Sequence, residues 1–593
     1  MVMAEAGKRS MTLTGPVRGQ IGTWLRERGS GLMALALLIG VGSGLGAIAF
    51  RWLITSATEL LTGRPEYTTA PGAAHAWLPG LGVWFLVLAP AVAGLLYGPL
   101  VYWLAPEAKG HGVPEVMYAV SERGGRIQPQ VSLVKALASA LCIGGGGSVG
   151  REGPIVQIGS ALGSTVGHRF KLTERRMRVL VACGAAGGIA ATFNAPMAGP
   201  FFAMELILRD FAVESFGAVV LSSVTASVIG RAVMGNEAFL TLPDFHLQNP
   251  GEFLLFALLG VLIGVAGLLF SKVLYGVEDL CDRLWRGPEW LRPGVGGLLL
   301  GLLLLVLPQM YGVGYPVLGN AIHGNYAIWF LIVLLFGKML ATSLTIGIGG
   351  SGGVFAPALF VGGMGGTAFG MVVHGLLPGI AGSPGAYGLI GMGAAFAGSA
   401  RAPITAVIIL FELTGQYSII LPLMLAVVVA TLLSRTLSKD TIYTAKLSRR
   451  GIDLDARQRR GRLPDRTVAD VMETLPDKLT TSTKLSDAAQ RLAQSVDSVL
   501  PVVDGNGRYR GCVTAGAVAE VLGDGTVDNG EVGKLLEVPP EISSENKLVD
   551  ALDSLVSVEV SAAPVLDERG TEPVGWISHR TLLSCMGTTA NTR

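Results

Sequence analysis

The pattern of hydrophobic and polar positions divides the chain into a long apolar part and a shorter part of mixed character. A bilayer-spanning helix needs roughly 20 apolar residues, so the long runs predict transmembrane helices and short ones, such as 133–147, predict helices that stop partway. Non-helical backbone at that depth must be buried or line a cavity. The pattern predicts an all-α polytopic membrane domain with broken helices. The apolar runs lie near 31–54, 79–104, 133–147, 179–208, 216–235, 252–275, 294–309, 328–346, 354–377, 386–412 and 420–436.

Beyond residue 437 the chain first becomes basic and then contains a second, soluble pattern. In the soluble part, Lys484-Leu485-x-Asp487-Ala488 and Pro501-Val502-Val503-Asp504 both recur 63 residues later. Each copy predicts an amphipathic helix, a turn and a short apolar strand. Two α/β units of about 60 residues are each too small to bury much core alone, so we expect them to pack on each other.

These patterns predict four regions. They are an N-terminal segment at 1–30, a transmembrane domain at 31–446, a basic linker at 447–466 and a tandem α/β pair at 467–593. Basic residues precede the first apolar run and follow the last one, which predicts that both termini are cytoplasmic. The first run, 31–54, is too long for the apolar region of a cleavable signal peptide.

Composition supports a membrane protein and gives no sign of enzymatic chemistry. Half of the residues are hydrophobic, 15% are charged and the mean hydropathy is +0.53. The net charge of +2 does not predict a nucleic-acid partner, and the odd count of five cysteines argues against a disulfide framework. The seven histidines are scattered, and H-E-x-x-H, G-x-S-x-G and Walker A patterns are absent from the sequence. We therefore expect no enzyme, no metal site and no cofactor.

A duplicated glycine motif carries the main functional signal. The segment 147–154 and the segment 350–357 share the pattern G-S-x-G-x-x-x-P, and each proline is followed five residues later by Gly159 or Gly362. A glycine turn that leads to proline predicts a loop entering a helix. Free helix N-termini attract anions, and broken helices in corresponding halves point to a transport site. The motif therefore predicts anion transport.

A second duplicated motif indicates that the membrane part consists of two homologous halves. Ala195-Pro196 is followed nine residues later by Glu205, and Ala402-Pro403 is followed nine residues later by Glu412. This motif repeats at an interval of 207 residues, close to the 203 residues that separate the glycine motifs. The structural interpretation of both glutamates is that they cap or pair at the membrane edge.

Four segments together resemble the CLC family of chloride channels and proton-coupled chloride exchangers. Three of them resemble the GSGIP, GREGP and GxFxP signatures, the fourth resembles the late tyrosine, and the resemblance covers roughly 31–585. The soluble pair is similar to the CBS domain pair of that family. The segments are Gly110-His111-Gly112-Val113-Pro114, Gly150-Arg151-Glu152-Gly153-Pro154, Gly353-Val354-Phe355-Ala356-Pro357 and Tyr443.

The resemblance implies a role for each matched residue. Glu152 is the expected gate and proton acceptor. The alternative is that Glu152 is a structural acid that pairs with the neighbouring Arg151. Tyr443 is the expected hydroxyl donor, although a lone tyrosine there is more often an interfacial anchor. The expected anion-binding residues are His111, Gly112, Gly353, Val354, Phe355 and Tyr443, supported by Gly150, Arg151, Gly153, Pro154 and Pro357.

The resemblance also implies an assembly and a setting. It implies a homodimer with one anion pathway per subunit, in a class that includes voltage-gated channels. Segments 194–235 and 403–436 are the expected interface. Chloride, protons and the lipid bilayer are the expected partners, and the expected location is a bacterial plasma membrane.

Two positions of the membrane domain depart from the family pattern. His111 stands where most members have serine: a protonated imidazole would make anion conduction depend on pH between about 5 and 8, whereas a neutral one is a hydrogen-bonded wall residue. By the same resemblance, Leu206 stands where well-known exchangers have the second of two consecutive glutamates, the one that loads intracellular protons. Leu206 favours a channel-like or weakly proton-coupled protein; the alternative is a proton-coupled chloride or fluoride antiporter.

The soluble pair departs as well. Adenosine-binding CBS units commonly have an aspartate three residues after a Ser or Thr; here Thr514 is followed by Ala517 and Ser578 by Thr581. Thr514 and Ser578 remain the candidate contacts to an adenine nucleotide, but a structural or dimerising pair is the favoured interpretation. An alternative from a different functional class is a CBS-regulated divalent-cation transporter. Such a transporter would need acid-rich transmembrane spans, and the apolar runs of this chain contain few acids.

Overall fold

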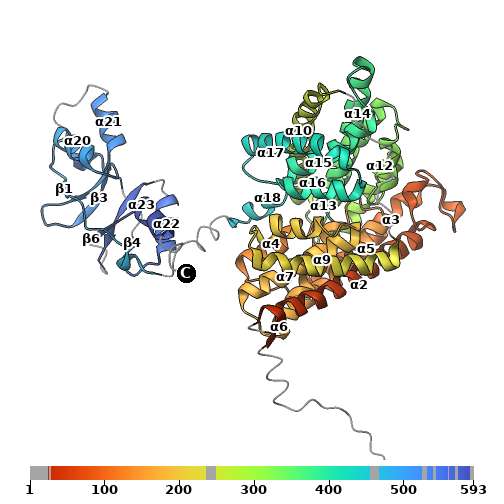
Figure 1. Cartoon of the computed structure of the whole chain (residues 1–593), viewed down its shortest axis with the longest axis horizontal. Coiled ribbons are helices and arrows are strands. Elements are labelled where there is room, and N and C mark those ends of the chain that lie inside the picture. The colour runs from red at the N-terminus through yellow and green to blue at the C-terminus, as the bar shows by residue number, and fades with distance from the viewer. Residues whose placement is uncertain are drawn as a thin grey trace, which may run out of the picture. The chain divides into compact units, whose positions relative to one another are not determined.

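The computed structural model describes residues 24–25, 28–235, 249–454, 466–523, 530–537, 542–557, 560–567 and 572–587. Two compact units result, Met1–Ile452 and Asp453–Arg593 (Figure 1). The first is helical and the second is α/β, so the predicted fold class is confirmed. Most of the predicted N-terminal segment 1–30 and of the linker 447–466 lies outside the described residues.

The helices of the first unit occur twice in the same order. Figure 1 draws the first series in red to yellow and the second in green to cyan. A long helix opens each series, and a short helix that follows a glycine and has proline in its first turn stands third. The first series is α2 (Gly29–Thr62), α3 (Phe85–Leu104), α4 (Val113–Glu122), α5 (Pro129–Gly144), α6 (Glu152–Arg169), α7 (Glu174–Phe193), α8 (Ala198–Phe202) and α9 (Val213–Met234). The second is α10 (Glu252–Leu284), α11 (Arg292–Val306), α12 (Tyr315–Ile322), α13 (Ile328–Gly347), α14 (Phe355–Leu376), α15 (Pro384–Ala400), α16 (Pro403–Thr414) and α17 (Ile420–Leu437). The predicted two-half architecture is confirmed.

Eight helices of the described chain are long and apolar enough to cross a bilayer, and further apolar helices are only 10–17 residues long. Two runs that look continuous in sequence, 179–208 and 386–412, are each broken before the Ala-Pro pair. Asn194 ends α7 and Arg401 ends α15, both in the left-handed region with φ of +58° and +54°. Since proline disfavours helical backbone in the residue before it, a new helix must start after the break.

Glycine lets the helices inside each half approach closely. A Cβ at Gly159 of α6 would collide with the Gly184 carbonyl of α7. The equivalent substitution at Gly362 of α14 would collide with the Gly391 carbonyl of α15. The glycine that follows each duplicated proline therefore serves the same close helix packing in both halves. After the last span a short helix, α18 (Thr444–Ser448), closes the unit.

The second unit contains two three-stranded sheets with identical topology. Within each sheet the first strand pairs parallel with the second, and the second pairs antiparallel with the third, with an irregularity near the end of the second strand. The elements are β1 (Leu479–Thr480), α20 (Leu485–Gln494), β2 (Val499–Val503), β3 (Tyr509–Thr514), α21 (Ala515–Gly523), β4 (Ile542–Ser543), α22 (Leu548–Ser557), β5 (Ala562–Leu566), β6 (Pro573–Ser578) and α23 (His579–Gly587).

The predicted helical faces form the cores of these two sheets. Leu485, Ala488 and Leu492 pack in one core, and the equivalent face of α22 packs in the other. A third cluster joins the sheets: Val499 and Cys512 come from the first, and Ala562 and Trp576 from the second. This shared cluster agrees with the expectation that the two α/β units pack on each other.

Candidate functional site

The two copies of the glycine motif pair with each other through their main chains. Gly150 N donates to Gly353 O at 2.7 Å, and Gly353 N donates to Gly150 O at 2.6 Å. Gly150 lies just before α6 and Gly353 just before α14, so the first turns of these two helices lie side by side. Two helix N-termini within the apolar unit are the anion-attracting feature that the motif predicts.

The loop before α4 joins the same pairing. Gly110 N donates to Gly350 O at 3.0 Å, and Gly352 N donates to Gly110 O at 3.3 Å. Gly112 then caps α4 with φ of +78°, a conformation that favours glycine. Three helix starts, those of α4, α6 and α14, therefore meet around one set of loops.

One predicted anion donor is already hydrogen bonded within the protein. The Gly353 N–H donates to Gly150 O, so a contribution of this amide to anion binding stays a prediction. Val354 and Phe355, at the start of α14, are both buried. The Phe355 ring packs edge-on against Phe396, with ring centroids 4.6 Å apart.

The supporting residues of the motif shape the turn into each helix. Pro154 and Pro357 each stand in the first turn, in α6 and α14, where the missing N–H costs no hydrogen bond. A Cβ at Gly153 would collide with the His111 carbonyl, so α4 and α6 begin in contact. The Arg151 guanidinium lies over the Tyr315 ring, 5.6 Å from its centroid.

Glu152 is buried at the first position of α6, with 1% of its surface exposed. Its Oε1 accepts a 2.6 Å hydrogen bond from the Tyr315 hydroxyl. Its Oε2 is buried and has no hydrogen-bond partner among the described residues. A Cβ at Gly150 would collide with Oε2, so the carboxylate folds back over the glycine loop. The acid predicted as a gate thus sits where the two motifs meet.

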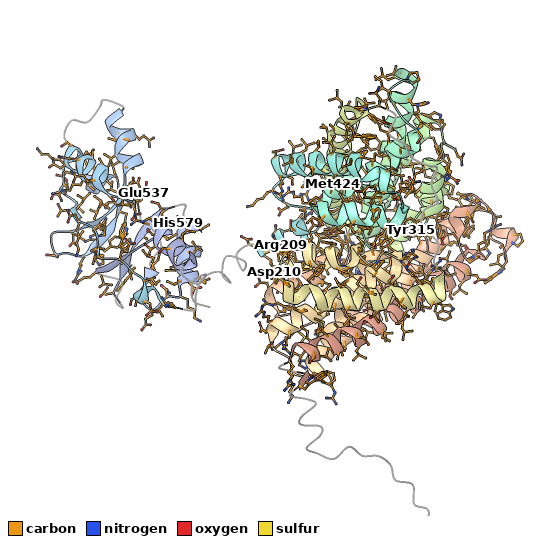
Figure 2. All side chains as sticks on the ribbon, in the orientation of Figure 1. Arg209, Asp210, Tyr315, Met424, Glu537 and His579 are labelled. Atoms are coloured by element: carbon orange, nitrogen blue, oxygen red, sulfur yellow. The ribbon has the colours of Figure 1, made fainter. Side chains whose placement is uncertain are left out.

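Tyr315 was not among the residues selected from the sequence, although a signal for it exists. It is the first residue of α12 (Figure 2) and follows Gly314, whose φ is +90°. The segment Gly312-Val313-Gly314-Tyr315-Pro316 repeats the pattern of the segment 110–114 at an interval of 202 residues. Extending the two-half alignment to this short motif would have identified the tyrosine.

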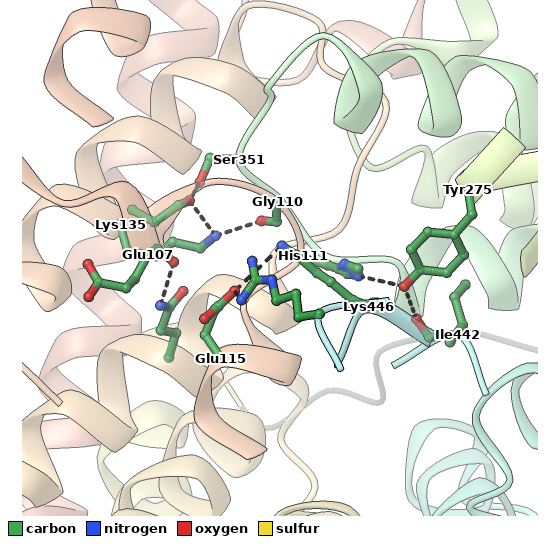
Figure 3. A network of polar contacts seen from close by, with 12 residues as sticks. Glu107, Gly110, His111, Glu115, Lys135, Tyr275, Ser351, Ile442 and Lys446 are labelled. Atoms are coloured by element: carbon green, nitrogen blue, oxygen red, sulfur yellow. Dashed lines mark hydrogen bonds and ion pairs between the residues drawn. The ribbon is translucent and has the colours of Figure 1, made fainter. Parts of the chain in front are cut away.

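The site has two polar corners: Glu152 with Tyr315 forms one, and His111 forms the other (Figure 3). It is 1% exposed, its Nδ1 has no hydrogen-bond partner among the described residues, and its Nε2 lies 3.4 Å from the Tyr275 hydroxyl. Tyr275, from α10, donates to Ile442 O at 2.6 Å. The Tyr443 ring is buried beside the imidazole, with centroids 6.4 Å apart. The structure therefore brings His111 and Tyr443 together.

Charged groups near His111 are mainly cationic. The His111 ring is within electrostatic reach of Lys135, Lys446 and Arg450. Glu115 lies at the edge of this group, 2.8 Å from Arg450 and 3.7 Å from Lys446. Since a protonated imidazole would add a further buried positive charge, the surroundings favour the neutral form of His111.

Two buried lysines hold the loops, and the sequence reading missed both. Lys135 of α5 donates to Ala108 O at 2.9 Å and to Gly110 O at 2.7 Å (Figure 3). Lys338 of α13 donates to Gly312 O at 3.0 Å, to Val313 O at 3.0 Å and to Ser148 Oγ at 2.9 Å. Their spacing of 203 residues equals that of the glycine motifs, so the repeat interval was again the available signal.

The paired glutamates are helix caps that cross between the halves. Glu205 accepts from Ile404 N at 3.2 Å, Thr405 N at 2.8 Å and Thr405 Oγ1 at 2.6 Å at the start of α16. Glu412 accepts from Met197 N at 2.8 Å and Ala198 N at 2.7 Å at the start of α8. The predicted capping role is confirmed for both.

Leu206 lies beside the first of these caps. It belongs to a π-helical turn, η4 (Ala203–Leu208), and is buried. Its neighbour Glu205 is committed to the α16 cap. The described turn therefore presents one carboxylate, which is already hydrogen bonded, and an apolar side chain next to it.

In the second unit the two candidate nucleotide contacts, Thr514 and Ser578, are hydrogen bonded to other residues of the protein. Thr514 donates to Glu537 Oε1 at 3.2 Å. Ser578 is buried and its hydroxyl lies 2.9 Å from that of Thr581, which donates to Glu473 Oε1 at 2.7 Å. Both hydroxyls thus take part in internal hydrogen bonds. Among the described residues there is no group of three His, Cys, Asp or Glu side chains arranged to hold a metal ion.

Comparisons with known sequences agree with this arrangement. The family described as voltage-gated chloride channel matches residues 93–435, and the CBS domain family matches residues 468–524. A putative chloride channel protein, ClcB-like, of Ralstonia nicotianae is 33% identical over 422 residues, which cover 70% of this chain and 97% of the relative. The H(+)/Cl(−) exchange transporter ClcA of Vibrio parahaemolyticus is 37% identical over 373 residues, covering 61% of this chain and 79% of the relative.

Solved structures give the same fold. A slow cyanobacterial Cl−/H+ antiporter aligns with a TM-score of 0.64 and 28% identity, covering 71% of this chain and 97% of that protein. A eukaryotic CLC transporter aligns with a TM-score of 0.60 and 23% identity, covering 93% of this chain and 97% of that protein. The second likeness extends the shared fold to nearly the whole chain. Together with the duplicated helix starts and the buried glutamate between them, these matches show that the chain belongs to the CLC family of multi-pass membrane proteins and carries a C-terminal CBS domain.

Proposed function

We propose that this chain transports chloride and similar small anions across a lipid bilayer, past the first turns of α4, α6 and α14, and that Glu152 gates the path. The observation that carries the proposal is the buried Glu152 carboxylate between the paired loops that precede α6 and α14. An ionised carboxylate there competes with an anion for the same helix ends, and a protonated one does not.

The donors proposed for the anion are neutral. They are the amides of Gly112, Val354 and Phe355, the Tyr443 hydroxyl and the neutral imidazole of His111. A permeant anion must lose its water and still leave, which weak donors allow and a direct ion pair does not. The names of the Ralstonia and Vibrio relatives support chloride as the substrate.

We propose that proton coupling is weak or absent. Leu206 offers no carboxylate, and Glu205 is committed to capping α16. The alternative is a proton-coupled chloride or fluoride antiporter, and the names of several relatives as H(+)/Cl(−) exchange transporters favour it. Membership of this family sets aside the divalent-cation transporter.

The proposed assembly is a homodimer with one pathway per subunit in a bacterial plasma membrane. Segments 194–235 and 403–436 carry exposed apolar side chains, including Val228 and Leu421, which suit either a second copy or lipid. The CBS pair is proposed to be structural or dimerising rather than nucleotide-binding, because Thr514 and Ser578 are hydrogen bonded within the protein.

The test is simultaneous chloride and proton flux from purified protein in liposomes with an outward chloride gradient. We expect chloride efflux with little or no uphill proton uptake, and faster efflux from Glu152→Gln at neutral pH. Uphill proton uptake that Glu152→Gln abolishes would establish the antiporter instead. Fluoride flux without chloride flux would contradict chloride as the substrate.

A further inference from the structure

We infer that Tyr315 is a second component of the gate: its hydroxyl holds the ionised Glu152 carboxylate in the blocking position, and its loss opens the pathway. This inference rests on the proposed gating role of Glu152 and adds a residue from the other half of the membrane domain. It makes Tyr315 a positioning residue, since it acts through Glu152.

The direct contact comes from two different helix starts. The Tyr315 hydroxyl, at the start of α12, donates to Glu152 Oε1, at the start of α6, at 2.6 Å. An O–H donor to an ionised carboxylate forms a short bond of about 2.5–2.7 Å that is roughly twice as strong as a neutral one. The contact thus favours the ionised, seated form of the glutamate.

The spacing of the two groups is fixed by a third residue. Lys338 Nζ donates to Gly312 O and Val313 O at 3.0 Å each, in the loop that leads to Tyr315. The same ammonium donates to Ser148 Oγ at 2.9 Å, in the loop that leads to Glu152. One buried lysine is therefore hydrogen bonded to both loops. These bonds fix the position of the Tyr315 hydroxyl relative to the Glu152 carboxylate.

The first half lacks this contact. Val113 stands at the position in the segment 110–114 that Tyr315 occupies in the segment 312–316, and valine has no donor. The hydroxyl is therefore not a feature of the repeated backbone. It is present only in the copy whose helix start faces the glutamate.

The charged and titratable groups around the Glu152 carboxylate are few. Arg151 precedes it on the same helix, Lys338 acts from α13, Tyr315 from α12 and Tyr443 from the segment before α18. Tyr315 supplies the side-chain hydrogen bond to the carboxylate, and the backbone amides of Glu152 and Ala356 also act on it. Removing that hydroxyl weakens the ionised form relative to the protonated one, so Glu152 protonates, and the path opens, at higher pH.

The experiment is chloride efflux from liposomes between pH 4.5 and 8 for the full chain and for Tyr315→Phe. Phenylalanine keeps the ring beneath Arg151 and removes only the oxygen. We expect the pH of half-maximal efflux to rise by about one unit and efflux at pH 7 to rise several-fold, as expected for loss of a hydrogen bond to a charged group. Size-exclusion chromatography checks that each variant is folded.

A matched control removes the same kind of hydrogen bond elsewhere. Tyr387 of α15 donates to Glu252 Oε1 of α10 at 3.0 Å, outside the paired loops that precede α6 and α14, and Tyr387→Phe is expected to keep the wild-type pH profile. In a Glu152→Gln background, Tyr315→Phe is expected to add nothing. An unchanged pH profile in Tyr315→Phe, with Glu152→Gln open, would overturn the inference alone. If Glu152→Gln behaves as wild type, the gating proposal fails as well.

If Tyr315→Phe does not yield folded protein, Tyr315→Leu replaces it. Leucine has no donor, so the pH midpoint is expected to rise as it does for phenylalanine. A raised midpoint supports the inference, and a wild-type midpoint contradicts it.

Discussion

The two loops that begin α4 and α12 have the same backbone but place their polar side chains differently. Gly112 and Gly314 both adopt positive φ, and a proline follows two residues later in each. His111 corresponds to Val313 and Val113 corresponds to Tyr315, so each loop has one polar side chain, at a different position. His111 lies next to Tyr275 and Tyr443, whereas Tyr315 contacts Glu152.

The groups that hold these loops, in contrast, repeat at a constant interval. Lys135 and Lys338, Ser139 and Thr342, and Ser148 and Ser351 are each separated by 203 residues. Ser139 Oγ lies 2.9 Å from Ser351 Oγ, and Thr342 Oγ1 donates to Ser148 O at 2.7 Å. The comparison teaches that the scaffold is symmetric while the side chains that approach the pathway are not.

The largest expected effect tests the symmetry of the two lysines. Lys338→Met leaves Gly312 O and Val313 O without another donor among the described residues, at a cost of about 2–6 kcal/mol for two buried carbonyls. Lys135→Met costs roughly 1–3 kcal/mol less, because Ala108 O also accepts from Ser351 Oγ and Gly110 O from Gly352 N. Thermal unfolding midpoints in detergent measure the difference.

Lys272, an exposed lysine on α10, provides the control. Lys272→Met removes the same charge without leaving a buried carbonyl unpaired, and we expect it to change the free energy of unfolding by less than about 0.5 kcal/mol. Equal losses of unfolding free energy for Lys135→Met and Lys338→Met would mean that the remaining donors to Ala108 O and Gly110 O add no stability. The proposed difference between the halves would then be wrong.

The helix caps should show the opposite behaviour, because they are nearly symmetric. Glu412→Ala removes the acceptor for two amides at the start of α8, and Glu205→Ala removes that for two amides and a hydroxyl at the start of α16. We expect losses of about 1–2 kcal/mol each, slightly larger for Glu205→Ala. The same thermal measurement applies, and Glu→Gln variants, which keep one acceptor oxygen, should recover part of the loss.

A loss at one cap only would show that the crossed caps are not equivalent. It would then be the surrounding residues, such as Thr405 at the α16 cap, that decide stability. Anion efflux from both alanine variants should stay close to wild type, because neither carboxylate contacts the paired loops.

The sequence was sufficient to predict the architecture because its signals are periodic or repeated. Apolar runs predicted the helices, and the glycine and Ala-Pro motifs predicted two halves. The breaks inside 179–208 and 386–412 were missed, since hydropathy alone does not register the left-handed turns at Asn194 and Arg401. The helical faces around Leu485 and Leu548 were predicted correctly because amphipathic spacing is explicit in a soluble helix.

The site was only partly predictable. Glu152 was identified by its motif, but which amides stay free depends on loop pairing, so the use of Gly353 N by Gly150 O could not be foreseen. Tyr315 contacts Glu152 across 163 residues of sequence, a proximity that only the fold creates. Lys135 and Lys338 stand singly in apolar runs, where a lysine has no visible partner because its acceptors are main-chain carbonyls.

The smallest expected effect concerns the other polar corner, His111. With Lys135, Lys446 and Arg450 nearby and little exposed surface, we expect a neutral imidazole that acts as a donor. His111→Ser keeps a donor of smaller reach, so chloride efflux should keep its pH profile between pH 5 and 8. The ratio of chloride to nitrate flux should change about 3–10-fold, as expected for one altered hydrogen bond of about 1 kcal/mol.

This variant separates the two corners of the site. If Tyr315→Phe moves the pH midpoint and His111→Ser does not, the pH response belongs to Glu152 and the corner that the second half supplies. If His111→Ser flattens the pH profile, the imidazole protonates in spite of its cationic neighbours, and the anion itself must supply the compensating charge. In that case the pathway would hold an anion next to His111 whenever the histidine is charged, and the two corners would act on the same ion in turn.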